Sequence, residues 1–260
     1  MRKSYNLLRL LPVIWGLLFL ATACDPGKNG KLTIAVSANM QYAMEELVEA
    51  FQHSTGTPCE MIVGSSGKLT AQIMEGAPFD LFLSADMKYP KEIYSRDLAY
   101  GEPQVYALGY LVLWSLDEDT DLTSEGLLSE NVRHVALANP ETAPYGVAAV
   151  DLLRGMGILD GIRRKLVYGE SIAQTNQFIL SGSAQVGITA RSVVSAPAAR
   201  DKGHWAETDP GLYRPIQQGI VVMKGEGSRL ESALAFAEFL RSPSAREILI
   251  RFGYGVENIE

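Results

Sequence analysis

The chain has 260 residues, of which 47% are hydrophobic and 20% charged, and its formal net charge is −7 at pH 7. A chain of this length and composition can bury its own core. Its acidic balance excludes nucleic acid as a partner, because nucleic-acid binding needs basic stripes. Any anion site must therefore be built locally, from N–H and O–H donors.

The first 23 residues have the order of an export signal. Basic residues at positions 2, 3 and 9 precede an apolar run, and Ala21-Thr22-Ala23 form a small-residue cleavage site. The apolar run is shorter than the ~20 residues that a transmembrane helix needs. We expect residues 1–23 to be a signal peptide. Its removal leaves 20 Lys and Arg against 30 Asp and Glu.

The residue after this cleavage site is a cysteine. Small residues directly before Cys24 resemble the bacterial lipobox, in which that cysteine is lipidated, although Ala21 stands where the lipobox usually has Leu. Residues 24–30 then form a small polar tether that would hold a globular body off a membrane surface. With Cys24 lipidated, Cys59 has no partner, so we expect no disulfide.

From residue 31 onward, strand-type and helix-type hydrophobic patterns alternate. The first strand is predicted over 31–36, and helical spacing follows from Met40 to Phe51. Further strands are expected at 59–63, 80–84, 110–114, 135–138, 186–189 and 219–223, and further helices at 68–75, 146–156, 172–181, 229–241 and 244–252. This alternation predicts α/β units around a largely parallel sheet, in two lobes of about 100 residues each.

Small and polar residues stand where strands end and helices begin. Ser37-Ala38-Asn39 follows the first strand, Gly64-Ser65-Ser66-Gly67 follows the second, and Pro144-Tyr145-Gly146 precedes a later helix. Each segment presents free backbone N–H groups at a helix N-terminus, where the partial positive charge favours anions. Serine and asparagine side chains add neutral donors. The three segments together predict an oxyanion site.

Taken singly, each of these segments has an ordinary structural explanation. Ser or Asn before a helix is commonly an N-cap, glycine is commonly a turn residue, and proline commonly starts a helix. Enzyme explanations lack support: Ser65 and Lys68 have the Ser-x-x-Lys spacing of penicillin-binding enzymes without the partner motifs. The three histidines show no metal-ligand spacing. We therefore expect a binding protein without a cofactor, not an enzyme.

Several ordered segments resemble the periplasmic molybdate-binding proteins, the ModA family of bacterial solute-binding proteins. The matching segments cover 31–40, 63–69, 76–86, 138–146 and 187–190, and the resemblance spans roughly residues 31–255. It implies an α/β, two-lobed periplasmic-binding-protein fold of type II. Each lobe would hold a mixed, mostly parallel sheet flanked by helices, with the ligand cleft between the lobes. Lobe 1 would comprise 31–109 plus 218–260, and lobe 2 would comprise 110–217.

The resemblance also implies which residues hold the ligand. Position by position, the oxyanion contacts are Asn39, Ser66, Tyr145 and Ile172, with Ser37 and Ser65 as further candidates. Molybdenum would be bound only as the oxyanion, without direct protein ligands. Ser66 should donate through its hydroxyl and its backbone, Tyr145 and Ile172 through their backbone N–H groups. A family tyrosine that donates its hydroxyl aligns with Ala190 here, so another group must replace it.

The same resemblance implies the partners and the location. The chain would be the extracytoplasmic, lipid-anchored substrate-binding component of an ABC importer, delivering molybdate or tungstate to the permease and ATPase subunits as a monomer. Two alternatives stay open. One is a receptor for another oxyanion, sulfate or phosphate, and the other is a ligand-sensing lipoprotein that is not coupled to transport.

Overall fold

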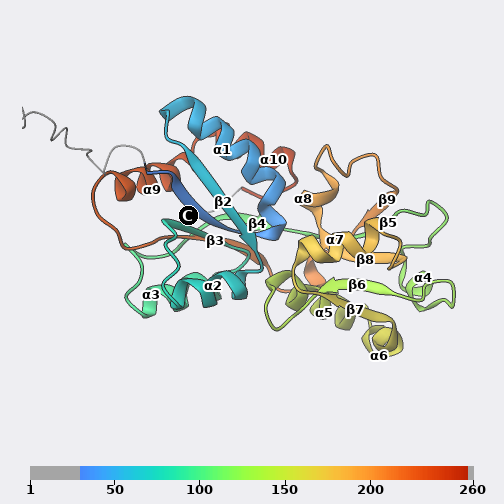
Figure 1. The fold of residues 1–260 in the computed structure, drawn as a ribbon. Helices are drawn as coiled ribbons and strands as arrows, with labels where there is room; N and C mark the ends of the chain where they lie inside the picture. Colours follow the sequence, from blue (N-terminus) through green and yellow to red (C-terminus); the bar gives the residue numbers. More distant parts are fainter. Residues whose placement is uncertain (1–29, 257–260) are drawn as a thin grey trace, which may run out of the picture.

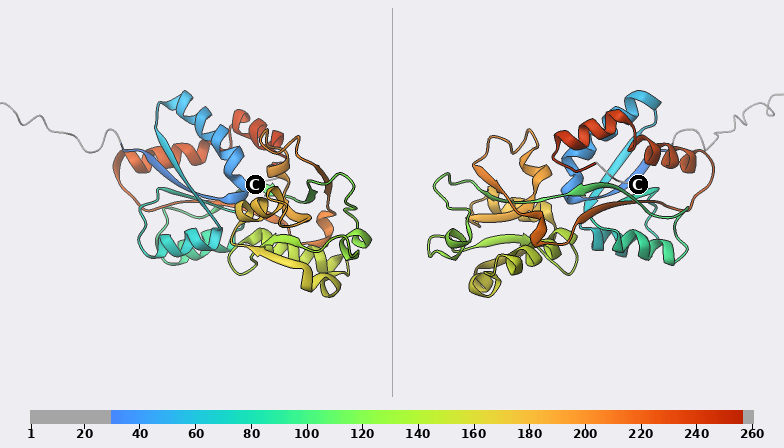
Figure 2. Two further views of the ribbon diagram at one scale, coloured as in Figure 1. Left: turned by 45° about the vertical axis from the view of Figure 1, so that its right-hand side comes forward. Right: turned by 180° about the vertical axis from the view of Figure 1, so that it is seen from behind.

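The computed structural model describes residues 30–256. The predicted signal peptide, Cys24 and residues 25–29 of the predicted tether lie outside the described residues. Two lobes lie side by side, each built on a five-stranded sheet (Figures 1 and 2). None of the helices in the described part of the chain is long and apolar enough to span a membrane.

The sheet of lobe 1 combines strands from the two ends of the chain. In spatial order its strands are β2 (Cys59–Gly64), β1 (Leu32–Ser37), β3 (Leu81–Ser84), β10 (Ile216–Val222) and β4 (Gln104–Gly109). The helices of this lobe are α1 (Gln41–Thr55), α2 (Ser66–Met74), α3 (Lys88–Ser95), α9 (Gly227–Phe239) and α10 (Pro243–Arg251). A 3₁₀ turn, η1 (Ala38–Met40), joins β1 to α1.

Alternate residues of this sheet face two separate cores. Ile34 and Val36 pack in the core beneath α1, α9 and α10, whereas Ala35 packs in the smaller core beneath α2 and α3. The same alternation separates Leu83 from Phe82 on β3. Helices therefore cover both faces, as Figure 1 shows, and a strand buried on both faces reads as a continuous apolar run.

Lobe 2 repeats this arrangement with a continuous stretch of chain. In spatial order its strands are β7 (Leu166–Gly169), β6 (Val135–Ala138), β8 (Val186–Ala190), β5 (Leu111–Ser115) and β9 (His204–Glu207). Its helices are α4 (Ser124–Leu128), α5 (Pro144–Gly155), α6 (Leu159–Ile162), α7 (Ile172–Leu180) and α8 (Arg191–Val194), with 3₁₀ turns η2 (Arg163–Lys165) and η3 (Pro210–Leu212). One apolar cluster, which includes Trp114 and Leu137, fills this lobe.

Two of the four pairings in each sheet are parallel and two are antiparallel. The sheets are mixed, as expected, but parallel pairings make up half of each sheet and not most of it. The reason is the double crossing of the chain. Strands β5 and β10 each follow a crossing from the other lobe, enter their sheet from its opposite end, and pair antiparallel to both neighbours.

Three strands were not predicted from the sequence: β4, β7 and β9. All three lie at sheet edges. An edge strand has one unpaired side and is partly exposed, so its apolar pattern is weak; β9, for example, reads His-Trp-Ala-Glu. The crossings themselves lie at Tyr110, between β4 and β5, and between η3 and β10, which begins at Ile216.

Candidate functional site

Five chain segments, three from lobe 1 and two from lobe 2, line a small cavity between the lobes. All six residues predicted to contact the ligand line it: Ser37, Asn39, Ser65, Ser66, Tyr145 and Ile172. The other lining residues are Ala38, Ala85, Ala143, Pro144 and Ser171. The structure thus brings together residues that are up to 135 positions apart in the sequence.

The sheet topology explains why these segments meet. Strands β1 and β2 are parallel neighbours in lobe 1, with Ser37 opposite Gly64, so the loops after their carboxyl ends lie together. Strands β6 and β7 hold the equivalent places in lobe 2, with Ala138 opposite Gly169. Ligands of open α/β sheets bind beyond the carboxyl ends of the strands. The two lobes point equivalent loops at each other.

Helix N-termini face the cavity from both lobes. Helix α2 begins at Ser66, α5 begins at Pro144 and α7 begins at Ile172. N–H groups in the first turn of a helix have no acceptor within the helix. Ser66, Tyr145 and Ile172 stand in these first turns and line the cavity. Their backbone N–H groups are positioned to donate to an anion. The positive end of each helix dipole, which lies at the same place, attracts the anion as well.

Three serine hydroxyls in the cavity have different surroundings. The Oγ of Ser66 accepts a hydrogen bond from the N–H of Ala85 at 3.0 Å, which leaves its own proton to donate. The Oγ of Ser65 accepts from the N–H of Lys68 at 3.4 Å and acts as the N-cap of α2. The Oγ of Ser37 is buried and has no hydrogen-bond partner among the described residues. Ser37 is therefore a donor without an acceptor.

The side chain of Asn39 is engaged away from the cavity. Its amide nitrogen donates to Oε1 of Gln218 at 2.8 Å and to the hydroxyl of Tyr254 at 3.1 Å. An asparagine amide has two hydrogens, so both are used. The sequence suggested that this side chain donates to the ligand; these bonds leave the backbone of Asn39 for that role.

Tyr145 is buried at the start of α5, behind the cavity. Burial raises the pKa of its hydroxyl well above the ordinary range, and the neighbouring Tyr254, Tyr213 and Tyr106 raise the pKa further, whereas Asn39 nearby lowers it. The hydroxyl makes no hydrogen bond of ordinary geometry with the described residues. Tyr145 is consequently a neutral residue: its hydroxyl, like that of Ser37, has no partner among the described residues, and its backbone N–H lies in the first turn of α5.

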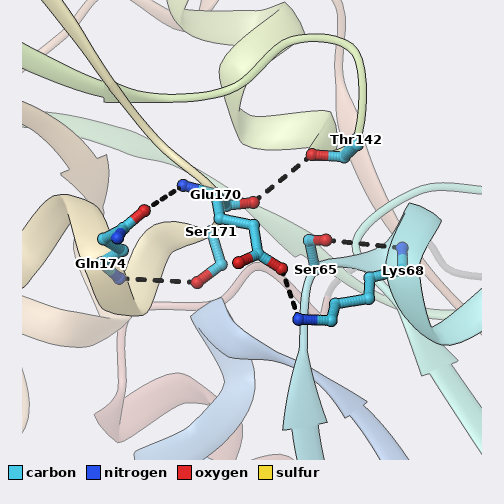
Figure 3. Close-up of polar contacts among 6 residues, drawn as sticks. All are labelled: Ser65, Lys68, Thr142, Glu170, Ser171 and Gln174. Carbon is cyan, nitrogen blue, oxygen red and sulfur yellow. Dashed lines mark hydrogen bonds and ion pairs between the residues drawn. The ribbon is translucent and has the colours of Figure 1, made fainter.

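The lobes touch at the mouth of the cavity. Nζ of Lys68, on α2, lies 2.7 Å from Oε1 of Glu170, which precedes α7; Figure 3 shows this ion pair. Beside this pair, the backbone N–H of Gly67 donates to the carbonyl oxygen of Thr142 at 2.9 Å. The hydroxyl of Thr142 in turn donates to the carbonyl oxygen of Glu170 at 3.4 Å. The ion pair and the Gly67–Thr142 hydrogen bond join the lobes, which are therefore closed against each other.

The lining of the cavity carries no Lys, Arg, His, Asp or Glu. Among residues 30–256, no group of three or more His, Cys, Asp or Glu side chains is placed to hold a metal ion. The arrangement offers neutral N–H and O–H donors from two lobes. Three residues behind the cavity were missed from the sequence, namely Gln218, Tyr254 and Ser192, because no motif links them to the loop at Asn39.

The chain resembles known proteins over nearly all of the described residues. The family model of bacterial extracellular solute-binding proteins matches residues 32–255. The molybdate-binding protein ModA of Rhodobacter capsulatus is 36% identical over 233 residues, covering 89% of this chain and 91% of that protein. ModA of Azotobacter vinelandii is 34% identical over 256 residues, covering 98% of this chain and 100% of that protein.

Solved structures agree with these relatives. The periplasmic molybdate-binding protein of Azotobacter vinelandii superimposes with a TM-score of 0.81 at 32% identity, covering 86% of this chain and 98% of that one. That similarity extends over both lobes and confirms the two-lobed type II fold expected from the sequence. The chain therefore belongs to the bacterial extracellular solute-binding protein family and, at these identities, to the family of the molybdate-binding proteins ModA.

Proposed function

We propose that this protein is the extracytoplasmic receptor of an ABC importer and that it binds molybdate, and tungstate, in the cavity between its lobes. One observation carries the proposal: five loops from two lobes converge on a cavity lined by neutral donors, without a charged side chain. The relatives above 30% identity are named as molybdate-binding proteins. The direct contacts would come from Ser37, Ser66 and the backbone N–H groups of Asn39, Tyr145 and Ile172, with Ser65 beside them.

Neutral donors suit an oxyanion that is fully ionised. All oxygens of such an anion are acceptors, and fixed N–H and O–H groups satisfy them without an ion pair. Helix N-termini add partial positive charge. An anion that keeps a proton needs an acceptor, and the backbone N–H groups at the first turns of α2, α5 and α7 can only donate. The cavity therefore favours molybdate or tungstate over protonated phosphate.

Ligand binding would hold the lobes together. Ser37 and Ser66 belong to one lobe, and Tyr145 and Ile172 belong to the other. Only the closed state makes all of these contacts, so the ligand stabilises that state by its differential affinity. A permease that recognises the closed form would then distinguish loaded from empty receptor. In this proposal the protein binds and delivers its ligand and performs no chemistry on it.

Titration of the mature protein tests the ligand directly. Isothermal calorimetry with molybdate, tungstate, sulfate and phosphate should give strong binding for the first two and weaker or undetectable binding for the others. The replacement Ser66→Ala should weaken molybdate binding by about 1–3 kcal/mol, because it removes a donor from a buried polar site. Preferential binding of sulfate or phosphate by the unaltered protein would support the alternative oxyanion receptor instead.

The anchor and the transport role need separate tests. We propose that residues 1–23 are removed, that Cys24 is lipidated, and that residues 24–30 tether a monomeric receptor to the membrane. Mass spectrometry of the mature protein should find the lipid on Cys24, and Cys24→Ser should release the protein from the membrane fraction. Molybdate uptake by intact cells should require the receptor, a permease and an ATPase together. Binding without any contribution to uptake would indicate the sensing role.

A further inference from the structure

A buried network of hydrogen bonds lies directly behind the anion cavity. The side-chain amide of Asn39 donates to Gln218 and Tyr254, and the backbone carbonyl oxygen of Asn39 accepts from the hydroxyl of Tyr254 at 2.9 Å and from Oγ of Ser192 at 2.7 Å. All four residues are buried, and only Asn39 lines the cavity. Three distant chain segments thus converge on one residue of the first loop.

Each partner of Asn39 is itself held in place. Nε2 of Gln218 donates to the carbonyl oxygen of Ile216 at 3.1 Å, and Gln218 lies at a register shift of β10 against β4. Such an irregularity changes the direction of a side chain, which then no longer follows the alternation between the two faces of the sheet. Tyr254 follows α10, where its N–H donates to the carbonyl oxygen of Leu249. The two acceptors offered to the amide of Asn39 are therefore rigid.

The consequence for the cavity concerns the backbone of the first loop. Asn39 is the middle residue of η1, a three-residue turn whose own geometry fixes little. Four hydrogen bonds on the side chain and the carbonyl of Asn39 fix the orientation of its peptide planes. Its carbonyl oxygen is directed to Ser192 and Tyr254.

We propose that Gln218 and Tyr254 are positioning residues of the anion site: they hold Asn39 so that its backbone N–H, not its side chain, faces the oxyanion. The proposal rests on the proposed function. It assigns ligand affinity to two residues that do not touch the ligand. It predicts that loss of either residue lowers the affinity for the ligand. If the side-chain amide of Asn39 were a direct donor, the same loss would leave the affinity unchanged or raise it.

Two variants of the full mature chain test this, with molybdate as the probe. Tyr254→Phe removes one oxygen, and Gln218→Met removes the acceptor at similar volume. Each should weaken molybdate binding by about threefold to tenfold in calorimetry, because each loosens a buried hydrogen-bonded turn. If the amide of Asn39 bound the ligand directly, freeing it from these partners would leave the affinity unchanged or raise it. Either of those results overturns the proposal.

A matched control and a double variant separate positioning from general destabilisation. Tyr106→Phe also removes a buried tyrosine hydroxyl, but that hydroxyl has no partner among the described residues, so the affinity should not change. In an Asn39→Ala background, Gln218→Met should cause no further loss. Additive losses would show that Gln218 acts independently of Asn39 and would reject the assignment.

The melting temperature of each ligand-free variant is measured alongside its affinity, since a purely structural role would lower the melting temperature without the selective loss of binding. Should Gln218→Met fail to fold, Tyr254→Phe, which deletes a single oxygen, carries the test alone. Failure of the unaltered protein to bind any oxyanion would refute the proposed function. Normal binding by the unaltered protein and by both variants would refute only this inference.

Discussion

Lys68 and Glu170 form an ion pair that bridges the two lobes at the mouth of the cavity, with 2.7 Å between Nζ and Oε1 (Figure 3). Both side chains are about half exposed, at 55% and 54%. Lys68 lies two residues beyond Ser66, and Glu170 lies two residues before Ile172, so the pair sits directly outside the proposed ligand contacts. Opening the lobes must separate the two charges.

Neutralising either partner should therefore speed release of the ligand. An exposed pair contributes about 0.2–1 kcal/mol, so Lys68→Gln or Glu170→Gln should raise the molybdate release rate by up to about fivefold at low salt. The effect should shrink as ionic strength rises, because salt screens exposed charges. Stopped-flow displacement measurements at low and high salt would give these rates.

The charge-reversed variant Lys68→Glu with Glu170→Lys should restore slow release, because it rebuilds the pair. Arg96→Gln is the matched control: Arg96, the residue directly after α3, pairs with Glu92 of that helix at 3.4 Å and does not bridge the lobes. Its release rate should equal that of the unaltered protein. Equal release rates for the Lys68 and Glu170 variants at low salt would show that the pair does not oppose opening.

Gly67 is required by the close approach of the lobes. A Cβ at this position would lie 2.9 Å from the carbonyl oxygen of Thr142 in the other lobe and 2.8 Å from the hydroxyl of Tyr89. The Tyr89 side chain can move, whereas the backbone at Thr142 is fixed once the lobes are closed. Gly67→Ala should weaken molybdate binding by about tenfold or more, since overpacking costs 1–3 kcal/mol.

Small-angle scattering would locate the cause of that loss. With saturating molybdate, the Gly67→Ala protein should keep a larger radius of gyration than the unaltered protein. Gly225→Ala provides the control, because a Cβ there meets no atom within 4 Å. Tight binding and full compaction of the Gly67→Ala protein would mean that the lobes close without the approach seen here.

The convergence of the loops that carry the proposed contacts could be predicted because these loops are marked by local signals. Ser37 ends a strand, whereas Ser66, Tyr145 and Ile172 stand in the first turn of a helix that follows a strand, and both features leave a pattern in a single sequence. Parallel pairing of β1 with β2 and of β6 with β7 then forces the loops together. Local pattern and sheet topology point to the same place.

The role of Asn39 could not be predicted in the same way. Its amide partners lie 179 and 215 residues away in the chain, and no pattern marks a hydrogen bond over such a separation. From the sequence alone, a polar residue at the start of a helix is equally compatible with a helix cap, a ligand contact or a member of a buried hydrogen-bond network. Only the three-dimensional packing of β10 and the segment after α10 decides among them.

Cys59 should be an unreactive thiol in the folded protein. Burial raises the pKa of Cys59 from its ordinary value of 9.0 to about 11, and the thiolate is the reactive form. In a Cys24→Ser background, Cys59 is the sole thiol of the chain. Its reaction with a disulfide reagent at pH 8 should be at least about tenfold slower in the folded protein than in the urea-unfolded chain. Equal rates for the folded and the unfolded chain would show that the Cys59 thiol is exposed to water in the folded protein.

The same shift gives a pH dependence of stability. Between pH 9 and 11 the unfolded chain releases the Cys59 proton while the folded protein keeps it, so the folded state binds more protons. The free energy of unfolding must then fall as the pH rises through this window. Urea unfolding at several pH values should show a steeper alkaline loss for the Cys24→Ser protein than for the same protein carrying Cys59→Ala. Parallel curves would contradict the shift.

Ser37→Ala should separate binding from folding. The Ser37 hydroxyl is buried without a partner among the described residues, so its removal takes away an unsatisfied polar group and should leave the stability of the ligand-free protein unchanged or slightly higher. Molybdate binding should nevertheless weaken by about 1 kcal/mol or more, because the ligand loses a donor.

Ser66→Ala is the contrast: it also leaves the N–H of Ala85 without an acceptor, so stability and affinity should both fall. Thermal unfolding and calorimetry on the two variants would measure this difference, and a Ser37→Ala protein with unchanged affinity would exclude that hydroxyl from the site.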